Sequence, residues 1–270
     1  MKTGIAKINE TEIYYEISGA GKPLVLVNGS SLDLQMWDAQ INDFNEHFQV
    51  VRYDLRGIGK SAIPEKNFSH SKDIYHLLNF LDIEKAHVLG LSVGGAFAVD
   101  FAAEHPEMVD SLILAAAATS DLRDEFSEGL SALSAMAKEK GVSAPIETLL
   151  QIPTFIAPEN VEAIQKTREI LFRNAHIFED DFPLIRFWQP PQIAINDMLS
   201  KITAPTLIIV GSKDDSAIHE IAEMLEKNIN HSKRLFIEDA GHLVNMEKPR
   251  EFNQSVINFL QELKTYRVNY

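Results

Sequence analysis

The most constraining feature of this chain is a glycine-rich turn that joins an apolar segment to a helical one. Residues 86–89 are rich in strand formers, a Gly-x-Ser-x-Gly pattern follows at residues 90–94, and a helical pattern continues over 95–104. So abrupt a passage from strand to helix holds the central residue in strained backbone geometry, and only small neighbours fit against the helix. The pattern therefore predicts a nucleophile elbow that presents the Ser92 hydroxyl near the positive end of a helix.

A serine at such a turn needs a histidine to take its proton and an acid to hold that histidine. His242 follows Gly241 in the loop after the apolar run 234–237. An imidazole ring in such a loop can turn between the acid and the serine hydroxyl. The other histidines lie in helical patterns, at helix ends or among charged residues, and fit structural roles. The chain order of serine, acid and histidine favours the elbow over an ordinary glycine–serine turn.

Two carboxylates compete for the role of the acid. Asp214 and Asp215 both lie just beyond the apolar run 204–211, at the end of a predicted late strand. An acid there accepts the Nδ1–H of the histidine and stabilises the imidazolium that forms. We favour Asp214, because Asp215 has a simpler role as the N-cap of the helix predicted over 216–227.

The loop after the apolar run 24–27 is the candidate for anion stabilisation. Loops at the carboxyl ends of parallel strands face one another, so Asn28-Gly29-Ser30 is expected to lie opposite the elbow. By itself, an Asn-Gly pair is more simply an ordinary turn. Its position relative to Ser92 favours an oxyanion hole made by the backbone N–H groups of Ser30 and Val93.

Apolar runs and helical patterns alternate up to about residue 119 and again from about residue 200, which predicts an α/β fold with a doubly wound, mostly parallel sheet of about eight strands. Between them the alternation lapses into helical stretches over 124–140 and 159–172, separated by prolines. We predict a core formed by residues 1–119 and 200–270, with a helical lid inserted at 120–199. Phe187 and Trp188 are the preferred lid residues for lining the substrate pocket.

The segment after the apolar run 49–53 resembles a phosphate-binding loop only superficially. Gly57 and Gly59 are present, but neither of the two nucleotide-binding glycine patterns is. We instead predict that Asp54 and Arg56 pair with each other and brace this loop.

Composition excludes several classes of function. The net charge of −14 disfavours nucleic acids and anionic membranes as partners. The chain has no cysteine, and no histidine pair has the helical spacing of a zinc site, so a metal site is not expected. A serine, histidine and acid that act together require no organic cofactor either. The N-terminus lacks the apolar core of a signal peptide, and no apolar run approaches the roughly 18 residues of a membrane span, which favours a cytoplasmic protein.

Five motifs, taken in order, resemble those of the α/β-hydrolase family, and the resemblance covers the chain outside the lid. They are Asn28-Gly29-Ser30, residues 54–61, the elbow at Ser92, Gly211-Ser212-Lys213-Asp214 and Gly241-His242. The family places its acid three residues after that glycine, which supports Asp214. Residues 26–54 are similar to the 3-oxoadipate enol-lactonase-like and small carboxylesterase branch, although many members have His-Gly in place of Asn28-Gly29. A serine at the elbow disfavours the dehalogenase and epoxide hydrolase branches, which use a carboxylate there.

This resemblance implies a serine hydrolase that cleaves a small carboxylic ester or lactone through an acyl-enzyme, with the triad Ser92, His242 and Asp214. Two alternatives stay open within enzymes: hydrolysis of a carbon–carbon bond in a ring-fission product, and cofactor-free perhydrolysis. From another class, the protein could be a ligand sensor that hydrolyses its ligand slowly and then engages a partner protein through the lid. Neither the substrate nor the oligomeric state follows from the sequence.

Overall fold

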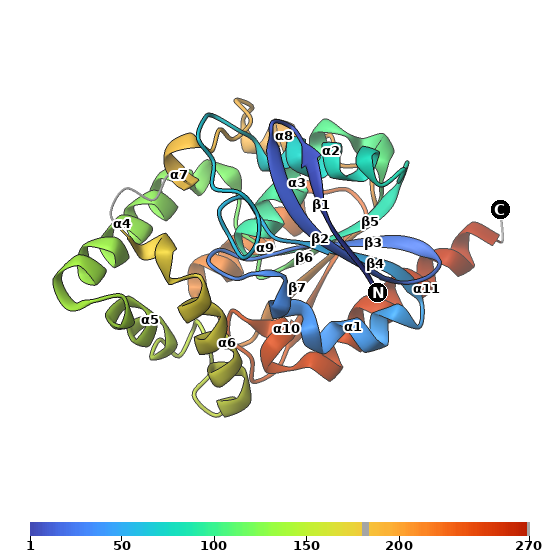
Figure 1. The fold of residues 1–270 in the computed structure, drawn as a ribbon. Helices are drawn as coiled ribbons and strands as arrows, with labels where there is room; N and C mark the ends of the chain where they lie inside the picture. Colours follow the sequence, from blue (N-terminus) through green and yellow to red (C-terminus); the bar gives the residue numbers. More distant parts are fainter. Residues whose placement is uncertain (180–183, 269–270) are drawn as a thin grey trace.

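The computed structural model describes residues 1–179 and 184–268, and a single twisted sheet runs through its centre (Figure 1). The strand order is β1-β2-β4-β3-β5-β6-β7-β8. The strands are β1 (Lys2–Ile8), β2 (Thr11–Gly19), β3 (Lys22–Val27), β4 (Phe48–Tyr53), β5 (Ala86–Leu91), β6 (Val109–Ala115), β7 (Thr206–Gly211) and β8 (Ser232–Ile237). β1 and β2 pair antiparallel to their neighbours, and the strands from β4 to β8 along the sheet are parallel. The predicted mostly parallel α/β sheet is confirmed.

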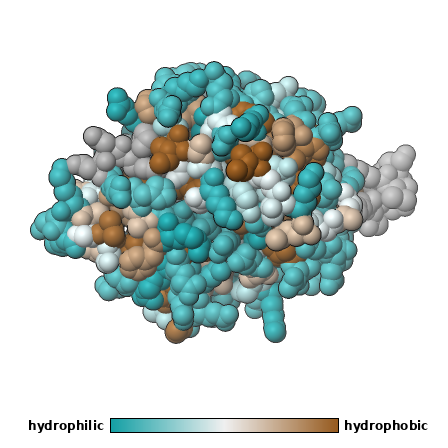
Figure 2. Space-filling view, viewed as in Figure 1, coloured by the Kyte–Doolittle hydropathy of each residue, from teal (hydrophilic) through white to brown (hydrophobic). Residues whose placement is uncertain are grey.

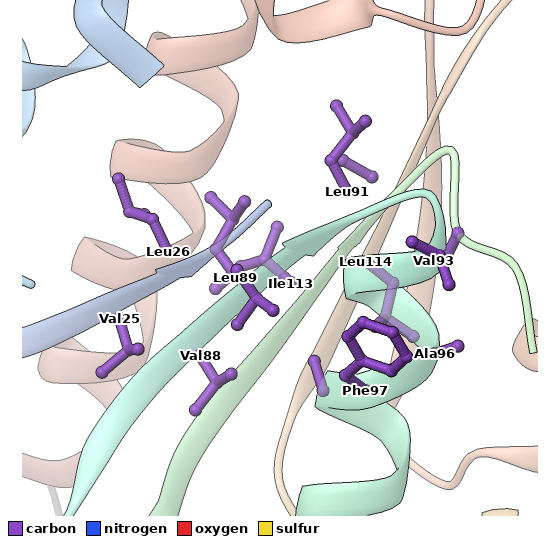
Figure 3. Close-up of a cluster of buried hydrophobic side chains, with 14 of the residues drawn as sticks. Val25, Leu26, Val88, Leu89, Leu91, Val93, Ala96, Phe97, Ile113 and Leu114 are labelled. Atoms are coloured by element: carbon purple, nitrogen blue, oxygen red, sulfur yellow. The ribbon is translucent and has the colours of Figure 1, made fainter. Parts of the chain in front are cut away.

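The central strands are apolar on both faces because helices cover both faces. In Figure 3, Val25 and Val88 lie on one side of the sheet, and Leu26 and Leu89 lie on the other. Each of these four side chains is fully buried. Continuous apolar runs are typical of parallel strands covered on both sides, which is why these strands could be recognised in the sequence.

Two groups of helices form the outer layers (Figure 1). α1 (Asp38–Asn45), α10 (Val244–Glu247) and α11 (Pro249–Val268) pack together, and α3 (Val93–Glu104) contacts both α2 (His70–Phe80) and α8 (Ile195–Leu199). α9 (Ser216–Asn228) packs on β7 and β8. The described surface in Figure 2 is mostly hydrophilic, with hydrophobic residues in small separate groups. None of the described helices combines the length and apolar character needed to cross a bilayer.

The chain between β6 and β7 forms a helical segment, which we define as α4 (Arg123–Lys140), α5 (Ser143–Leu150), α6 (Val161–Arg173), α7 (Leu184–Phe187) and α8. α4 and α6 correspond to the helices predicted over 124–140 and 159–172, whereas α5 was not predicted. Figure 1 shows α4, α5 and α6 together beyond one end of the sheet. This end carries the carboxyl ends of the parallel strands, where ligands bind in such sheets.

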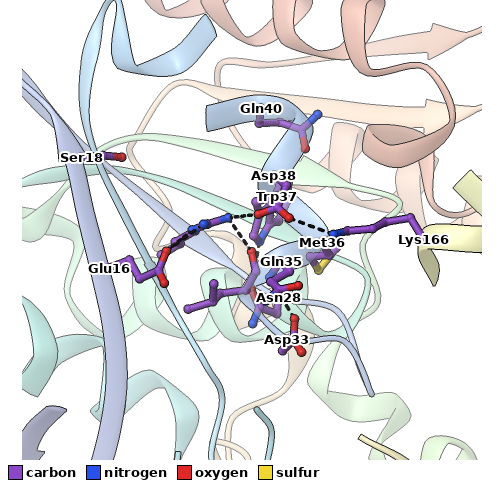
Figure 4. A network of polar contacts seen from close by, with 12 residues as sticks. Glu16, Ser18, Asn28, Asp33, Gln35, Met36, Trp37, Asp38, Gln40 and Lys166 are labelled. Atoms are coloured by element: carbon purple, nitrogen blue, oxygen red, sulfur yellow. Dashed lines mark hydrogen bonds and ion pairs between the residues drawn. The ribbon is translucent and has the colours of Figure 1, made fainter. Parts of the chain in front are cut away.

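Ion pairs fasten this helical segment to the sheet layer. Asp38 of α1 binds Arg52 of β4 at 2.7 Å and Lys166 of α6 at 3.0 Å. Arg52 also donates two hydrogen bonds to Glu16 of β2. Figure 4 shows Asp38 between Glu16 and Lys166, so a continuous chain of charges leads from the sheet to α6.

The predicted pairing of Asp54 with Arg56 is wrong. The Arg56 guanidinium instead donates hydrogen bonds of 2.7 and 2.6 Å to Asp73 of α2, and both side chains are buried. Asp54 accepts the backbone N–H groups of Leu34 and Lys60 at 2.9 Å each. Both residues do brace the loop, but Arg56 does so through Asp73 on α2, and Asp54 does so through backbone N–H groups, none of which the sequence indicated.

Two glycine-to-alanine substitutions test how closely the backbones approach at the elbow. A Cβ on Gly94 would lie 2.3 Å from the Asn28 carbonyl oxygen, whereas a Cβ on Gly129 in α4 would meet no atom within 4 Å. We expect Gly94→Ala to lower the free energy of unfolding by about 2 kcal/mol or more through overpacking. Gly129→Ala should raise it by up to about 1 kcal/mol, because alanine favours helix over glycine.

Urea denaturation of both variants measures these changes. Equal effects of the two substitutions would contradict the close approach at Gly94.

Candidate active site

The turn after β5 places Ser92 in the strained geometry that the sequence pattern predicts. Its φ of 56° and ψ of −125° lie where non-glycine residues rarely occur. The Ser92 N–H donates to the Ala115 carbonyl at 2.9 Å, and the Ser92 carbonyl accepts from Gly95 and Ala118. These bonds to β6 and to the first turn of α3 hold the strained residue in place.

His242 and Asp214 lie in line with Ser92. The Nε2 of His242 is 2.8 Å from Ser92 Oγ, and its Nδ1 is 3.1 Å from each carboxylate oxygen of Asp214. The Asp214 side chain is 1% exposed and that of His242 is 14% exposed. A buried acid on Nδ1 fixes the histidine tautomer that leaves Nε2 as the acceptor for a hydroxyl proton.

Asp215, the competing acid, faces the other way. Its carboxylate accepts the N–H of Ala217 at 3.0 Å and caps α9. Its own N–H donates to Asp214 at 2.7 Å, which helps to orient the Asp214 carboxylate. The structure therefore brings Asp214, and not Asp215, to His242.

Ser30 lines the same cavity as Ser92, and Val93 follows Ser92 at the first position of α3. Neither of their backbone N–H groups donates a hydrogen bond within the described structure, so both are available to a ligand. The neighbouring Asn28 side chain has another role, because it donates to the Tyr53 carbonyl and accepts from the Trp37 indole, each at 2.9 Å. The Asn28 side chain thus anchors the loop through these two bonds and makes no hydrogen bond to the N–H of Ser30.

A cavity of about 470 Å³ opens beside Ser92 and His242. Its lining comes from the loops after β3, β5 and β8 and from the helical segment. The residues are Gly29, Ser30, Ser31, Leu32, Leu91, Ser92, Glu125, Phe126, Gly129, Leu130, Leu133, Leu149, Phe155, Leu171, His242 and Leu243. The described residues contain no group of three or more His, Asp or Glu side chains placed to hold a metal ion.

The sequence profile of the family described as alpha/beta hydrolase fold matches residues 22–249. The chain belongs to the α/β-hydrolase family. It is 27% identical to 3-oxoadipate enol-lactonase 2 of Acinetobacter baylyi, over 90% of each chain. It is also 27% identical to a 2-hydroxy-6-oxononadienedioate/2-hydroxy-6-oxononatrienedioate hydrolase of Paraburkholderia phymatum, over 93% of this chain and 91% of that protein. The crystal structure of the enol-lactonase from Burkholderia xenovorans LB400 shares the fold, with a TM-score of 0.79, 24% identity and coverage of 96% of this chain and 100% of that one. The resemblance drawn from the motifs is confirmed, and the protein is a hydrolase.

Phe187 and Trp188, the residues selected from the sequence for the pocket, do not line the cavity of this α/β-hydrolase. Trp188 is 3% exposed and packs edge-on against Phe97 of α3, with ring centroids 5.2 Å apart. The Phe187 carbonyl accepts the N–H of Phe68 at 2.9 Å. These two residues therefore attach the chain at the end of α7 to the core.

The cavity wall that the sequence analysis missed comes mainly from α4. Phe126, Leu130 and Leu133 recur at spacings of four and three, which places them on one face of that helix. The rest of α4 is largely polar, so this narrow apolar stripe was a readable signal. The spacing of apolar residues along one helix, rather than the size of single aromatic side chains, therefore indicates the wall.

Glu247 was also missed, although it holds the backbone next to His242. Its buried carboxylate accepts the N–H of Gly241 at 3.1 Å, the N–H of Ala157 at 2.9 Å and the side-chain amide of Asn160 at 2.7 Å. One carboxylate thus joins the histidine loop to the chain between α5 and α6.

Backbone hydrogen bonds reinforce this junction. The N–H of His242 donates to the Thr154 carbonyl at 2.9 Å, and the N–H of Leu243 donates to the Phe155 carbonyl at 3.3 Å. The Phe155 ring stacks near the His242 imidazole, with centroids 6.1 Å apart. The position of His242 therefore depends on the helical segment as well as on the core.

Substituting Glu247 tests this junction. Glu247→Ala leaves buried N–H groups of Gly241 and Ala157 without an acceptor, and each such group costs about 1–3 kcal/mol. We expect the free energy of unfolding to fall by about 3 kcal/mol in urea denaturation. Glu251→Ala, a change at an exposed glutamate in the first turn of α11, is the matched control and should leave stability nearly unchanged. Similar losses in the two variants would contradict the role assigned to Glu247.

Proposed function

We propose that this hydrolase cleaves a small carboxylic ester or lactone through an acyl-enzyme formed on Ser92. The observation that carries the proposal is the aligned chain from Ser92 Oγ through the His242 ring to the Asp214 carboxylate, at 2.8 and 3.1 Å. The relative named as an enol-lactonase supports acyl-transfer chemistry. The apolar cavity beside Ser92 offers a place for the acyl or alcohol part of the substrate.

In the first step Ser92 Oγ attacks the substrate carbonyl while Nε2 of His242 takes the hydroxyl proton. Asp214 stabilises the imidazolium that forms. The free N–H groups of Ser30 and Val93 receive the oxyanion, and donors of this kind contribute about 3–4 kcal/mol each to transition-state stabilisation. His242 then returns the proton to the departing alkoxide, which leaves as the alcohol.

The second step releases the acyl group. A water molecule takes the place of the alcohol, Nε2 of His242 removes one of its protons, and the resulting hydroxide attacks the acyl carbon. Collapse of the second oxyanion breaks the bond to Ser92 Oγ, which recovers its proton from His242. In a lactone the acid and the alcohol are released as one hydroxy acid.

The helical segment acts as the lid in this proposal. α4, α5 and α6 contribute Phe126, Leu130, Leu133, Leu149 and Leu171 to the cavity wall, opposite the loops that carry Ser92 and His242. A cover of this kind excludes water from the bound acyl group and selects substrates by shape.

Ser92→Ala and His242→Ala test the proposal most directly. Each variant should lower kcat for p-nitrophenyl esters and simple lactones by about 10⁴-fold or more, because the residues of a triad act as a unit. Labelling by a fluorophosphonate, followed by peptide mass mapping, should place the adduct on Ser92. Turnover at the wild-type rate in either variant would refute the assignment. Single-turnover hydrolysis by the unmodified protein would favour the sensor alternative.

Asparagine substitutions distinguish the two adjacent acids. Asp214→Asn should lower kcat by about 10⁴-fold, because the amide stabilises the wrong tautomer of His242. Asp215→Asn is the matched control, since asparagine also caps helices and should leave kcat within a few-fold of wild type. The reverse pattern would show that Asp215 serves as the acid.

A further inference from the structure

The cavity beside Ser92 contains almost no charge. Among the described residues that line it, Glu125 is the only carboxylate, and neither lysine nor arginine is present. Apart from the groups proposed for catalysis and a few small polar residues, the wall is aliphatic or aromatic. A substrate carboxylate inside this space would lose its water and meet no cation in return, which is strongly unfavourable.

The arginines closest in sequence to the wall residues on α4 and α6 already have partners. Arg123, two residues before Glu125, donates to the Trp188 carbonyl at 3.1 Å and pairs with Asp124 at 3.2 Å. Arg173, two residues after the wall residue Leu171, pairs with Asp33 at 2.7 Å. The carboxylates of Asp124 and Asp33 therefore compete for these two guanidinium groups with any anion in the cavity.

Glu125 adds a repulsive charge to this apolar space. It lies in the first turn of α4 and is exposed, while Phe126 beside it forms part of the wall. An anion bound in this cavity therefore meets the negative charge of Glu125. Exposed charges act over about one Debye length, roughly 8–10 Å in physiological salt, so Glu125 acts locally.

From these observations we propose that the substrate of this site is an ester or lactone with an uncharged, apolar chain, and that Glu125 discriminates against substrates carrying a carboxylate. This inference rests on the proposed function of Ser92. It assigns the selectivity to two features. One is the free-energy cost of removing water from an anion in a cavity that offers no cation, and the other is the negative charge at the first turn of α4.

Two esters that differ in one group test the inference. p-Nitrophenyl hexanoate and mono-p-nitrophenyl adipate share the leaving group and the acyl length, but only the adipate ends in a carboxylate. We expect kcat/KM to favour the hexanoate by about a hundredfold in the unmodified protein. In Glu125→Lys this ratio should fall by about tenfold, and the fall should shrink as salt is added.

Glu139→Lys is the matched control. It makes the same charge change on the same helix, about 21 Å further along at 1.5 Å per residue, outside the cavity lining. The ratio should change less than twofold in this variant, and circular dichroism should show that both variants keep the wild-type helix content.

Each contrary result would overturn a different part of the inference. An unmodified protein that prefers the adipate, or shows no preference, would overturn the inference about substrate class and leave the esterase assignment intact. Equal effects of Glu125→Lys and Glu139→Lys would overturn the role of Glu125. Failure to turn over either ester would overturn the proposed function itself, together with this inference.

Discussion

The close approach of α3 to the loop after β3 is the constraint on which the site depends. Gly94 lies so near the carbonyl oxygens of Val27 and Asn28 that no side chain fits between them. This contact fixes the start of α3, and with it the strained Ser92 and the N–H of Val93. It also brings the loop that carries Ser30 within reach of the same space. Steric exclusion between two backbones therefore positions groups that are about sixty residues apart in the sequence.

The parts of the fold that could be predicted follow local rules. The buried strands are continuous apolar runs, and the turn at Ser92 has the glycines that its geometry demands. The contacts of Arg56 with Asp73, and of Glu247 with Gly241 and Ala157, join residues whose proximity exists only after folding. No periodicity or spacing in the sequence predicts such pairs. The pocket wall is an intermediate case, because the stripe on α4 was visible in the sequence but nothing local showed which way it faces.

Buried carboxylates have a common use in this acidic chain. Asp54, Asp214 and Glu247 each accept backbone N–H groups in loops, and Asp73 holds a buried arginine. Burial alone favours the neutral form of a carboxyl group, and it raises the pKa of Asp54 to about 6. Loops near the site are thus held by acceptors, while the described residues that line the cavity include a single carboxylate and neither lysine nor arginine.

The backbone bonds from His242 and Leu243 to Thr154 and Phe155 have a consequence for how new specificities arise in such a scaffold. An exchange of the whole helical segment between two family members would replace the pocket and, in the same step, cut the supports of the histidine loop. Side-chain changes along the stripe on α4 leave those bonds in place. Successive substitutions along one helix can therefore change the substrate specificity of this architecture while His242 keeps its position.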